Sequence, residues 1–275
     1  MKRIVFAAAA VACQAVFASE ITIDLKLDEL DYVSGERVRG VVDVKNMSPD
    51  KIGVGYKGAK DVLAMEVFLA ADMTRLETVS DIPFVSAFEL DSNQGTKLEV
   101  LLDAHFPLSE QRKYLVRPVL VHGGIRYEGR LRAFDVVRGM KVTGAVQMFS
   151  NRKGLRREFE LVKWSRRNHE HLFATAKDTD AEGGERKWRT FDLGDMMRMT
   201  PPVVSIMPGG EVVVLHRADR DNFIRSEFWS MPDALEFVGA MAVRDPETAG
   251  QERVQELYES SGGVKPVDRP WWKIW

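Results

Sequence analysis

Residues 21–46, ITIDLKLDELDYVSGERVRGVVDVKN, indicate the fold class of this chain. Apolar side chains alternate with polar or charged ones from Ile21 to Leu27, the pattern of a strand with one buried face. The residues Tyr32-Val33-Ser34-Gly35-Glu36 predict a turn. A second strand is expected from Val38 to Val44, and Asn46-Met47-Ser48-Pro49 ends it. The opening therefore predicts adjacent strands of a β protein.

Four further strands are expected before residue 139. In the last of them Ile125, Tyr127, Leu131 and Ala133 lie on one face and charged residues on the other. His122-Gly123-Gly124 predicts the tight hairpin before it, because glycine tolerates a positive φ. Several short strands separated by turns favour an antiparallel β-sandwich. The expected strands cover residues 63–69, 98–102, 114–121 and 125–137.

A resemblance to a known group of domains rests on four features of this opening. Tyr32-x-x-Gly35-Glu36, Gly40, the β run to Val44 and Asn46-x-Ser48 resemble the first strands of immunoglobulin-like domains of the macroglobulin or arrestin-like kind. The resemblance covers about residues 20–139. It implies a two-sheet sandwich used for spacing or protein contact, with no catalytic residue and with Tyr114 as its corner tyrosine.

The strand pattern restarts near Arg138-Gly139, which predicts a second domain. Its strands are expected at 142–149, 158–164 and 172–176, and residues 159–176 and 212–228 resemble each other as hairpins. Two short helices are expected at the end of this domain, one from Ser230-Met231-Pro232-Asp233 to Met241 and one from Asp245 to Gly262. The predicted class is therefore mostly β. An immunoglobulin-like antiparallel β-sandwich (19–139) precedes a second antiparallel β domain with two short C-terminal helices (140–263) and an aromatic tail (264–275).

The N-terminus has the composition of a cleavable export signal. Basic Lys2 and Arg3 precede an apolar run from Ile4 to Ala12, and Val16 and Ala18 fit the small-residue rule for cleavage after residue 18. We therefore expect an exported protein of the bacterial periplasm or the extracellular space. The alternative is a lipoprotein modified at Cys13, which follows Ala10-Val11-Ala12.

Composition limits the remaining chemistry. Cleavage after Ala18 removes the only cysteine, so the mature chain is expected to have no disulfide and no thiolate site. Loss of Lys2 and Arg3 leaves 37 basic against 41 acidic side chains, a formal net charge of −4. This balance argues against a nucleic-acid partner. No later stretch approaches the roughly 20 apolar residues of a spanning helix, so no transmembrane segment is expected in the mature chain.

His169-x-His171 has the spacing of a metal-binding pair. On a strand, alternate side chains share one face, so the two imidazoles of His169 and His171 could bind zinc or copper. The alternative is an exposed hairpin without metal, and no cofactor is expected.

The densest basic segment indicates a surface for a polyanion such as an anionic glycan or a lipid head group. The alternative is a solvated strand face, whose charge the acidic loop from Asp178 to Glu185 neutralises. The candidates are Arg152, Lys153, Arg156, Arg157, Arg166 and Arg167.

The C-terminal tail concentrates aromatic side chains. Trp271, Trp272 and Trp275 are three of the six tryptophans, and exposed aromatic groups are typical of interfaces. They are candidates for docking an envelope protein. The alternative is that the tail folds back onto its own sandwich.

Motifs for catalysis are missing from the sequence. There is no Gly-x-Ser-x-Gly, and Gly209-Gly210 lacks the lysine and serine of a phosphate loop. We therefore expect a non-enzymatic binding or scaffolding module of the cell envelope. The alternative is a hydrolase or a metal-dependent enzyme that acts on envelope polymers.

Overall fold

The computed structural model describes residues 20–55 and 59–244 and is built from nineteen strands. The only helical element in this described part is a short 3-10 turn, Leu102–Ala104. No helix among these residues is long and apolar enough to cross a membrane. The mostly β class expected from the sequence is confirmed.

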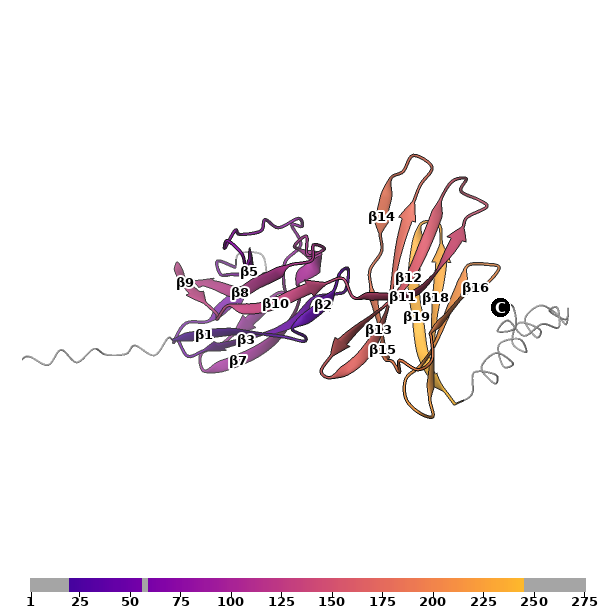
Figure 1. Ribbon diagram of the computed structural model, residues 1–275. Helices are drawn as coiled ribbons and strands as arrows, with labels where there is room; N and C mark the ends of the chain where they lie inside the picture. The colour runs from indigo at the N-terminus through magenta and orange to yellow at the C-terminus, as the bar shows by residue number, and fades with distance from the viewer. Residues whose placement is uncertain (1–19, 56–58, 245–275) are drawn as a thin grey trace, which may run out of the picture.

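The N-terminal sandwich (residues 20–137) contains two main sheets (Figure 1). The first has the antiparallel order β1 (Ile21–Leu27), β3 (Arg39–Asn46), β7 (Gln94–Leu101). The second has the order β2 (Asp31–Val33), β10 (Arg132–Val137), β8 (Lys113–His122), β5 (Val62–Leu69), and β9 (Ile125–Glu128) also pairs with β8. A short ladder joins β4 (Ile52–Val54) to β6 (Phe88–Leu90).

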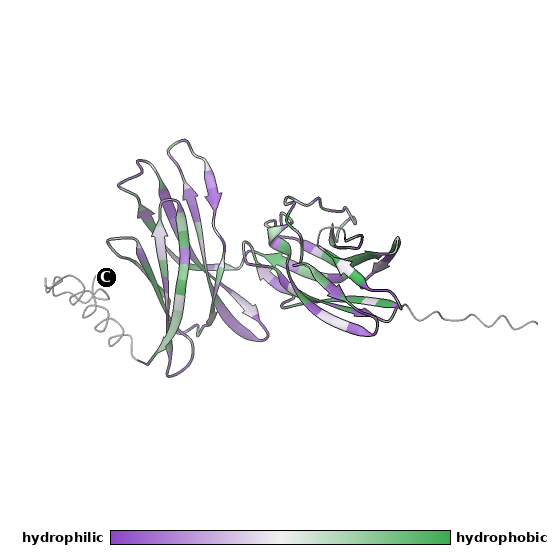
Figure 2. Ribbon diagram, turned by 180° about the vertical axis from the view of Figure 1, so that it is seen from behind, coloured by the Kyte–Doolittle hydropathy of each residue, from purple (hydrophilic) through white to green (hydrophobic). Residues whose placement is uncertain are grey.

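The core of this sandwich follows from the alternation read in the sequence. Ile21, Ile23 and Leu25 are buried, while the side chains between them are more exposed. Figure 2 shows the same alternation of apolar and polar residues along strands of both sandwiches. Tyr114 stacks on Phe134 at 5.4 Å between ring centroids, and its hydroxyl donates a hydrogen bond to the Glu110 carbonyl at 3.0 Å. This bond connects the start of β8 to the segment that precedes it.

The C-terminal sandwich (residues 140–243) also has two sheets. The first contains β11 (Met140–Met148), β12 (Arg156–Arg166), β13 (His169–Thr179) and β14 (Glu185–Lys187) in that order, and β15 (Phe191–Asp195) also pairs with β13. The second has the order β16 (Val203–Ile206), β17 (Glu211–Arg217), β18 (Phe223–Met231), β19 (Ala234–Val243). Both sheets contribute to one core, with Phe159 and Leu161 on one side and Val212, Val214 and Phe228 on the other.

The prediction of a helix from Ser230 to Met241 is wrong. Residues 223–231 and 234–243 form an antiparallel hairpin, with Pro232 and Asp233 in its turn. The apolar period here is two, because Leu235 and Phe237 pack against the core while Glu236 between them is exposed. The fold class with two C-terminal helices is therefore corrected to strands up to Val243. The second expected helix, from Asp245, lies outside the described residues, as do the predicted signal and the aromatic tail.

The prediction of one continuous strand from Ile125 to Val137 is also wrong. The strand is interrupted at Gly129: β9 ends at Glu128 and β10 begins at Arg132. The buried residues of β10 are Phe134 and Val136. A Cβ at Gly129 would lie 2.6 Å from Cγ of Pro118, so only glycine allows this close approach. Because side chains alternate with period two, the break reverses the buried face expected from Leu131 and Ala133.

Candidate functional site

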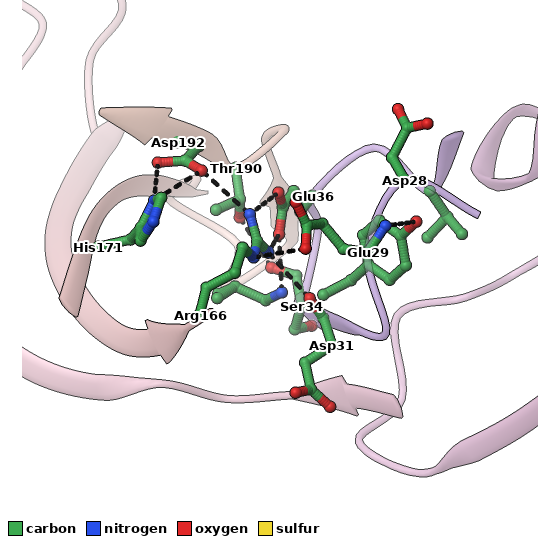
Figure 3. Close-up of polar contacts among 12 residues, drawn as sticks. Asp28, Glu29, Asp31, Ser34, Glu36, Arg166, His171, Thr190 and Asp192 are labelled. Atoms are coloured by element: carbon green, nitrogen blue, oxygen red, sulfur yellow. Dashed lines mark hydrogen bonds and ion pairs between the residues drawn. The ribbon is translucent and has the colours of Figure 1, made fainter. Parts of the chain in front are cut away.

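Arg166, at the end of β12, joins the two sandwiches (Figure 3). Its Nη1 and Nη2 atoms lie 3.0 and 2.8 Å from the two carboxylate oxygens of Glu36 in the N-terminal sandwich. Nη2 also donates to the Asp31 carbonyl at 2.9 Å. The side chain of Arg166 is only 6% exposed. A two-point Arg–carboxylate pair of this kind fixes the relative orientation of its two groups. It therefore connects the two sandwiches at a defined position.

The same guanidinium belongs to a chain of charges on the C-terminal side. Its Nη1 lies 3.0 Å from Oδ2 of Asp192, which is 3.2 Å from Nδ1 of His171. The Nε2 atom of His171 lies 3.2 Å from Oδ1 of Asp195. The hydrogen bond with Asp192 raises the pKa of His171. Burial opposes ionisation of Asp192, but its bonds with His171 and Gly194 and the charge of Arg166 keep its pKa low.

Backbone contacts reinforce this junction. The hydroxyl of Thr190 donates to the Ser34 carbonyl at 2.7 Å, and the Thr190 amide donates to the Gly35 carbonyl at 2.8 Å. Gly35 has φ of +87°, and a Cβ there would lie 2.9 Å from Oγ1 of Thr190. Glycine is therefore required for both the turn and the close approach. A second ion pair, Arg167 with Glu29 at 2.7 Å, lies beside the first.

A groove of about 290 Å³ opens beside the junction, with residues of both sandwiches in its walls. An adjacent hollow of about 470 Å³ shares four of these residues. We call the two together the junction groove. Its polar part is lined by three arginines, Arg37, Arg39 and Arg189, by Arg166, and by the carboxylates of Asp28, Glu29, Glu36 and Asp192. Its apolar part is lined by Trp188, Phe191, Leu235 and Phe237.

The three arginines of the groove differ from Arg166 in their partners. Within residues 20–55 and 59–244, no carboxylate lies within ion-pair distance of Arg37, Arg39 or Arg189. Burial, then the charges of Arg37 and Arg39, lower the pKa of Arg189. Asp103 exerts only a distant attraction, and its carboxylate accepts a hydrogen bond from the Val38 amide at 2.8 Å. Arg166 is paired with carboxylates that line the groove, so the guanidinium groups of Arg37, Arg39 and Arg189 are the ones available to an anion.

The basic segment predicted from the sequence is divided between two places. β12 has eleven residues, so its ends are about 35 Å apart at roughly 3.3 Å a residue. Arg166 and Arg167 lie at the junction, whereas Arg152, Lys153 and Arg156 lie at the opposite end of the strand. There Arg152 pairs with Asp233, and Arg156 pairs with Glu158 at 3.4 Å. The structure does not bring the six side chains together on one face.

Arg157, the remaining member of that segment, is fully buried. Its guanidinium makes a two-point pair with Asp178 at 2.6 and 2.8 Å and donates to Oγ of Ser230 at 2.9 Å. The rings of Phe149 and Trp188 lie 5.2 and 4.5 Å from its central carbon. These contacts connect the two sheets of the C-terminal sandwich, and Arg157 has no free surface for a polyanion.

The two histidines of the expected metal pair lie on β13 with different surroundings. His169 is largely exposed, with Nδ1 at 4.0 Å from Asp195, whereas both nitrogens of His171 face carboxylates. No group of three or more His, Cys, Asp or Glu side chains in the described residues is arranged to hold a metal ion. The zinc or copper site stays a prediction. The docking candidates Trp271, Trp272 and Trp275 lie outside the described residues.

Sequence reasoning missed the three arginines of the groove. Arg37 and Arg39 follow a turn near the start of the chain, and Arg189 lies about 150 residues later. The run Arg186-Lys187-Trp188-Arg189 carries the one local signal, because basic residues beside an aromatic one are typical of anion-binding surfaces. Nothing local in the sequence pairs that run with Arg37.

No family model and no curated protein matches the chain. Solved structures with limited similarity to the chain include the following two. Sporulation control protein Spo0M from Bacillus subtilis is 14% identical and covers 88% of this chain and 97% of its own, with a TM-score of 0.31. The NanB sialidase from Streptococcus pneumoniae, in complex with 2-[(3-chlorobenzyl)ammonio]ethanesulfonate, is 8% identical and covers 81% of this chain and 39% of its own, with a TM-score of 0.24. Both scores are too low for either likeness to bear on the fold or the function of this chain.

Proposed function

We propose that this protein is an exported, non-enzymatic binding protein of the bacterial envelope, and that the junction groove binds an anionic ligand. The observation that carries the proposal is the convergence of Arg37, Arg39 and Arg189 on one groove without a carboxylate partner among the described residues. Guanidinium groups bind phosphate, sulfate and carboxylate through paired hydrogen bonds. The ligand is therefore expected to carry one of these groups.

The apolar part of the groove indicates the chemical nature of the ligand beyond its anionic group. Trp188, Phe191 and Phe237 lie beside the arginines, and the Arg189 guanidinium lies 4.8 Å from the Phe191 ring centre. A concave site with an apolar wall and a few charged groups is typical of small-ligand binding. We expect an anionic group attached to a ring or a short apolar chain.

Binding without catalysis is supported by the state of the nearby carboxylates. Glu29, Glu36 and Asp192 are each engaged by Arg166, and Glu29 also by Arg167. A general acid or base must reach the substrate, and the carboxylate oxygens of these three residues are engaged by the guanidinium groups of the junction. The groove is thus suited to attraction and orientation of an anion.

We also propose that the N-terminal sandwich belongs to the immunoglobulin-like group. The contact from Tyr114 to the Glu110 carbonyl and the packing of two mainly antiparallel sheets support this assignment. Such domains act through surfaces and loops, in agreement with a binding role.

Calorimetric titration of the full chain tests the proposal, with phenyl phosphate and inorganic phosphate as probes. The test variant is Arg37→Glu combined with Arg189→Glu. The matched control is Lys45→Glu combined with Lys97→Glu, which makes the same charge change on an exposed face of the N-terminal sandwich. We expect phenyl phosphate to bind more tightly than phosphate, the groove variant to lose binding, and the control to keep it.

Other results would contradict the proposal in distinct ways. Equal weakening in both double variants would mean that only net charge matters. Absence of binding by the unchanged protein would remove the anion site. Release of phosphate from phenyl phosphate during the titration would favour the alternative of a hydrolase.

A further inference from the structure

β7 is an edge strand of the first sheet of the N-terminal sandwich and lies at the lower rim of that sandwich in Figure 1. Its eight residues, Gln94–Leu101, pair with β3 on one side. On the other side the described part of the chain places no strand. An edge of this kind presents unpaired backbone amides and carbonyls, with which another strand can pair. β7 is therefore open to the addition of a further strand.

The ladder between β3 and β7 identifies the backbone groups that lie at this edge. The amide of Leu102 donates to the Val38 carbonyl at 2.9 Å, in the same register as the rest of the ladder. In an antiparallel ladder, hydrogen-bonded pairs recur at every second residue. Alternate residues from Gln94 to Val100 are therefore directed to β3. The other four residues direct their amides and carbonyls to the free edge, and these are Gly95, Lys97, Glu99 and Leu101.

The side chains of β7 carry opposite charges two positions apart. Lys97 and Glu99 are both exposed on the outer face of the sheet, and neither forms an ion pair with another described residue. Leu98 between them faces the core but is only partly buried. Charged side chains on an edge strand usually discourage pairing with other molecules. Here the order of the charges instead makes the edge complementary to a second copy of itself.

Complementarity between two copies is obtained with a two-fold axis beside Leu98. Antiparallel pairing of β7 with β7 of a second copy then puts Lys97 of each copy opposite Glu99 of the other, and Leu98 opposite Leu98. The same register pairs Gly95 with Leu101, so every residue with free backbone groups has a partner. An axis beside Lys97 or beside Glu99 would place like charges opposite each other, which is destabilising. The edge therefore specifies one register.

We propose that this protein forms a dimer through β7, in which the three-stranded sheets of two copies become one continuous sheet. Backbone hydrogen bonds hold the two strands together, and the two pairs of Lys97 with Glu99 set the register. Contact between the two Leu98 side chains buries apolar surface that a single copy leaves exposed. The interface uses the same strand of both copies, so the assembly closes at two. The inference is independent of the anion site, because other residues line the junction groove.

Sedimentation equilibrium of the full chain over a series of concentrations tests the proposal. We expect the mass to rise towards twice that of the monomer. Glu99→Lys and Lys97→Glu each place like charges opposite each other, so each protein is expected to stay monomeric where the unchanged protein dimerises. An equimolar mixture of the two is expected to recover the dimer, because one copy then presents two lysines and the other two glutamates. Lys26→Glu, on the exposed side of β1 at the far edge of the same sheet, is the control and is expected to dimerise normally.

Three results would overturn the proposal. A monomer mass of the unchanged protein at every concentration would exclude the dimer, and a dimer that persists in Glu99→Lys would use another surface. A mixture of the two folded variants that stays monomeric would exclude the pairing of Lys97 with Glu99.

Circular dichroism establishes that each variant is folded. Lys97 lies opposite Asp43 in the ladder, so Lys97→Glu creates a like-charge pair within one copy. If that protein does not fold, the mass of Glu99→Lys alone decides. Phenyl phosphate titration of Glu99→Lys is expected to match that of the unchanged protein, so this proposal and that of the anion site can fail separately.

Discussion

Arg166 is the residue on which the junction of the two sandwiches depends. Its guanidinium is paired with Glu36 from one sandwich and Asp192 from the other. Removal of a buried cation leaves its carboxylate partners uncompensated, which costs more than the pair itself contributes. A single substitution at Arg166 should therefore lower the stability of both sandwiches.

Replacement of Arg166 by Met is expected to lower the free energy of unfolding by about 2–4 kcal/mol, somewhat below a wholly buried pair because Asp192 is partly exposed. Urea unfolding measures the change. Arg156→Met is the matched control, because the Arg156 pair with Glu158 is largely exposed and is expected to contribute less than about 1 kcal/mol. Equal effects of the two substitutions would contradict the assigned role of Arg166.

His171 is expected to make stability fall as the pH rises. Its pKa is raised in the folded protein, chiefly by Asp192. The stabilisation from its charged form is therefore complete below the ordinary histidine value of about 6.5 and is lost as the pH rises through the folded pKa. Stability curves of the unchanged protein and of His171→Gln should converge at alkaline pH and separate as the pH falls towards about 6. Parallel curves would exclude this contribution.

His216 is expected to act in the opposite direction. Burial lowers its pKa to about 4, and its Nε2 atom lies 3.1 Å from the Asp195 carbonyl. The neutral ring is the folded form, so its contribution is complete above about pH 6.5 and is lost as the pH falls towards 4. His216→Gln should show a shallower loss of stability over that interval, which thermal unfolding at several pH values measures. The same slope in both proteins would count against a buried neutral imidazole.

At the scale of elements, strands were predictable where a period-two pattern lay between clear turn residues. The strand from Ile21 to Leu27 was predicted with its boundaries and its buried face. Residues 234–243 were not, because Pro232-Asp233 is typical of a helix start as well as of a hairpin turn. The break at Gly129 escaped prediction for a different reason. It depends on the approach of Pro118 from another strand, which no local pattern contains.

Substitution of Gly129 tests whether the close approach of Pro118 requires glycine between β9 and β10. Gly129→Ala places a methyl group 2.6 Å from Pro118 and 2.9 Å from the Ile23 carbonyl, and is expected to cost about 1–3 kcal/mol. Gly239→Ala is the control, because its Cβ would meet nothing within 4 Å, and is expected to change stability by less than about 0.5 kcal/mol. Chemical unfolding of both proteins gives the comparison. An unchanged free energy of unfolding in Gly129→Ala would mean that the backbone around residue 129 shifts at little cost.

At the scale of the whole molecule, the candidate site depends on contacts between distant parts of the chain. Arg37 and Arg189 line one groove only because Thr190 is hydrogen-bonded to Ser34 and Gly35. Composition and periodicity predict strands, but they do not predict which surfaces of two sandwiches meet. The individual arginines were visible in the sequence, and their convergence was not.

The N-terminus of the mature chain tests the predicted export. We expect the protein recovered from the envelope to begin at Ser19, because cleavage after Ala18 removes the basic and apolar N-terminal residues. Intact mass measurement and N-terminal sequencing give the result. A chain that begins at a lipid-modified Cys13 would establish the lipoprotein alternative, and an intact Met1 would contradict export by cleavage.

A crystal structure of the full chain with phenyl phosphate would show whether the junction groove binds an anion. We expect the phosphoryl oxygens to lie within hydrogen-bond distance of Arg37, Arg39 and Arg189, with the ring against Phe191 and Phe237. Binding of phenyl phosphate at the Arg152-Lys153 turn, or no ordered ligand at all, would mean that the groove is not an anion site.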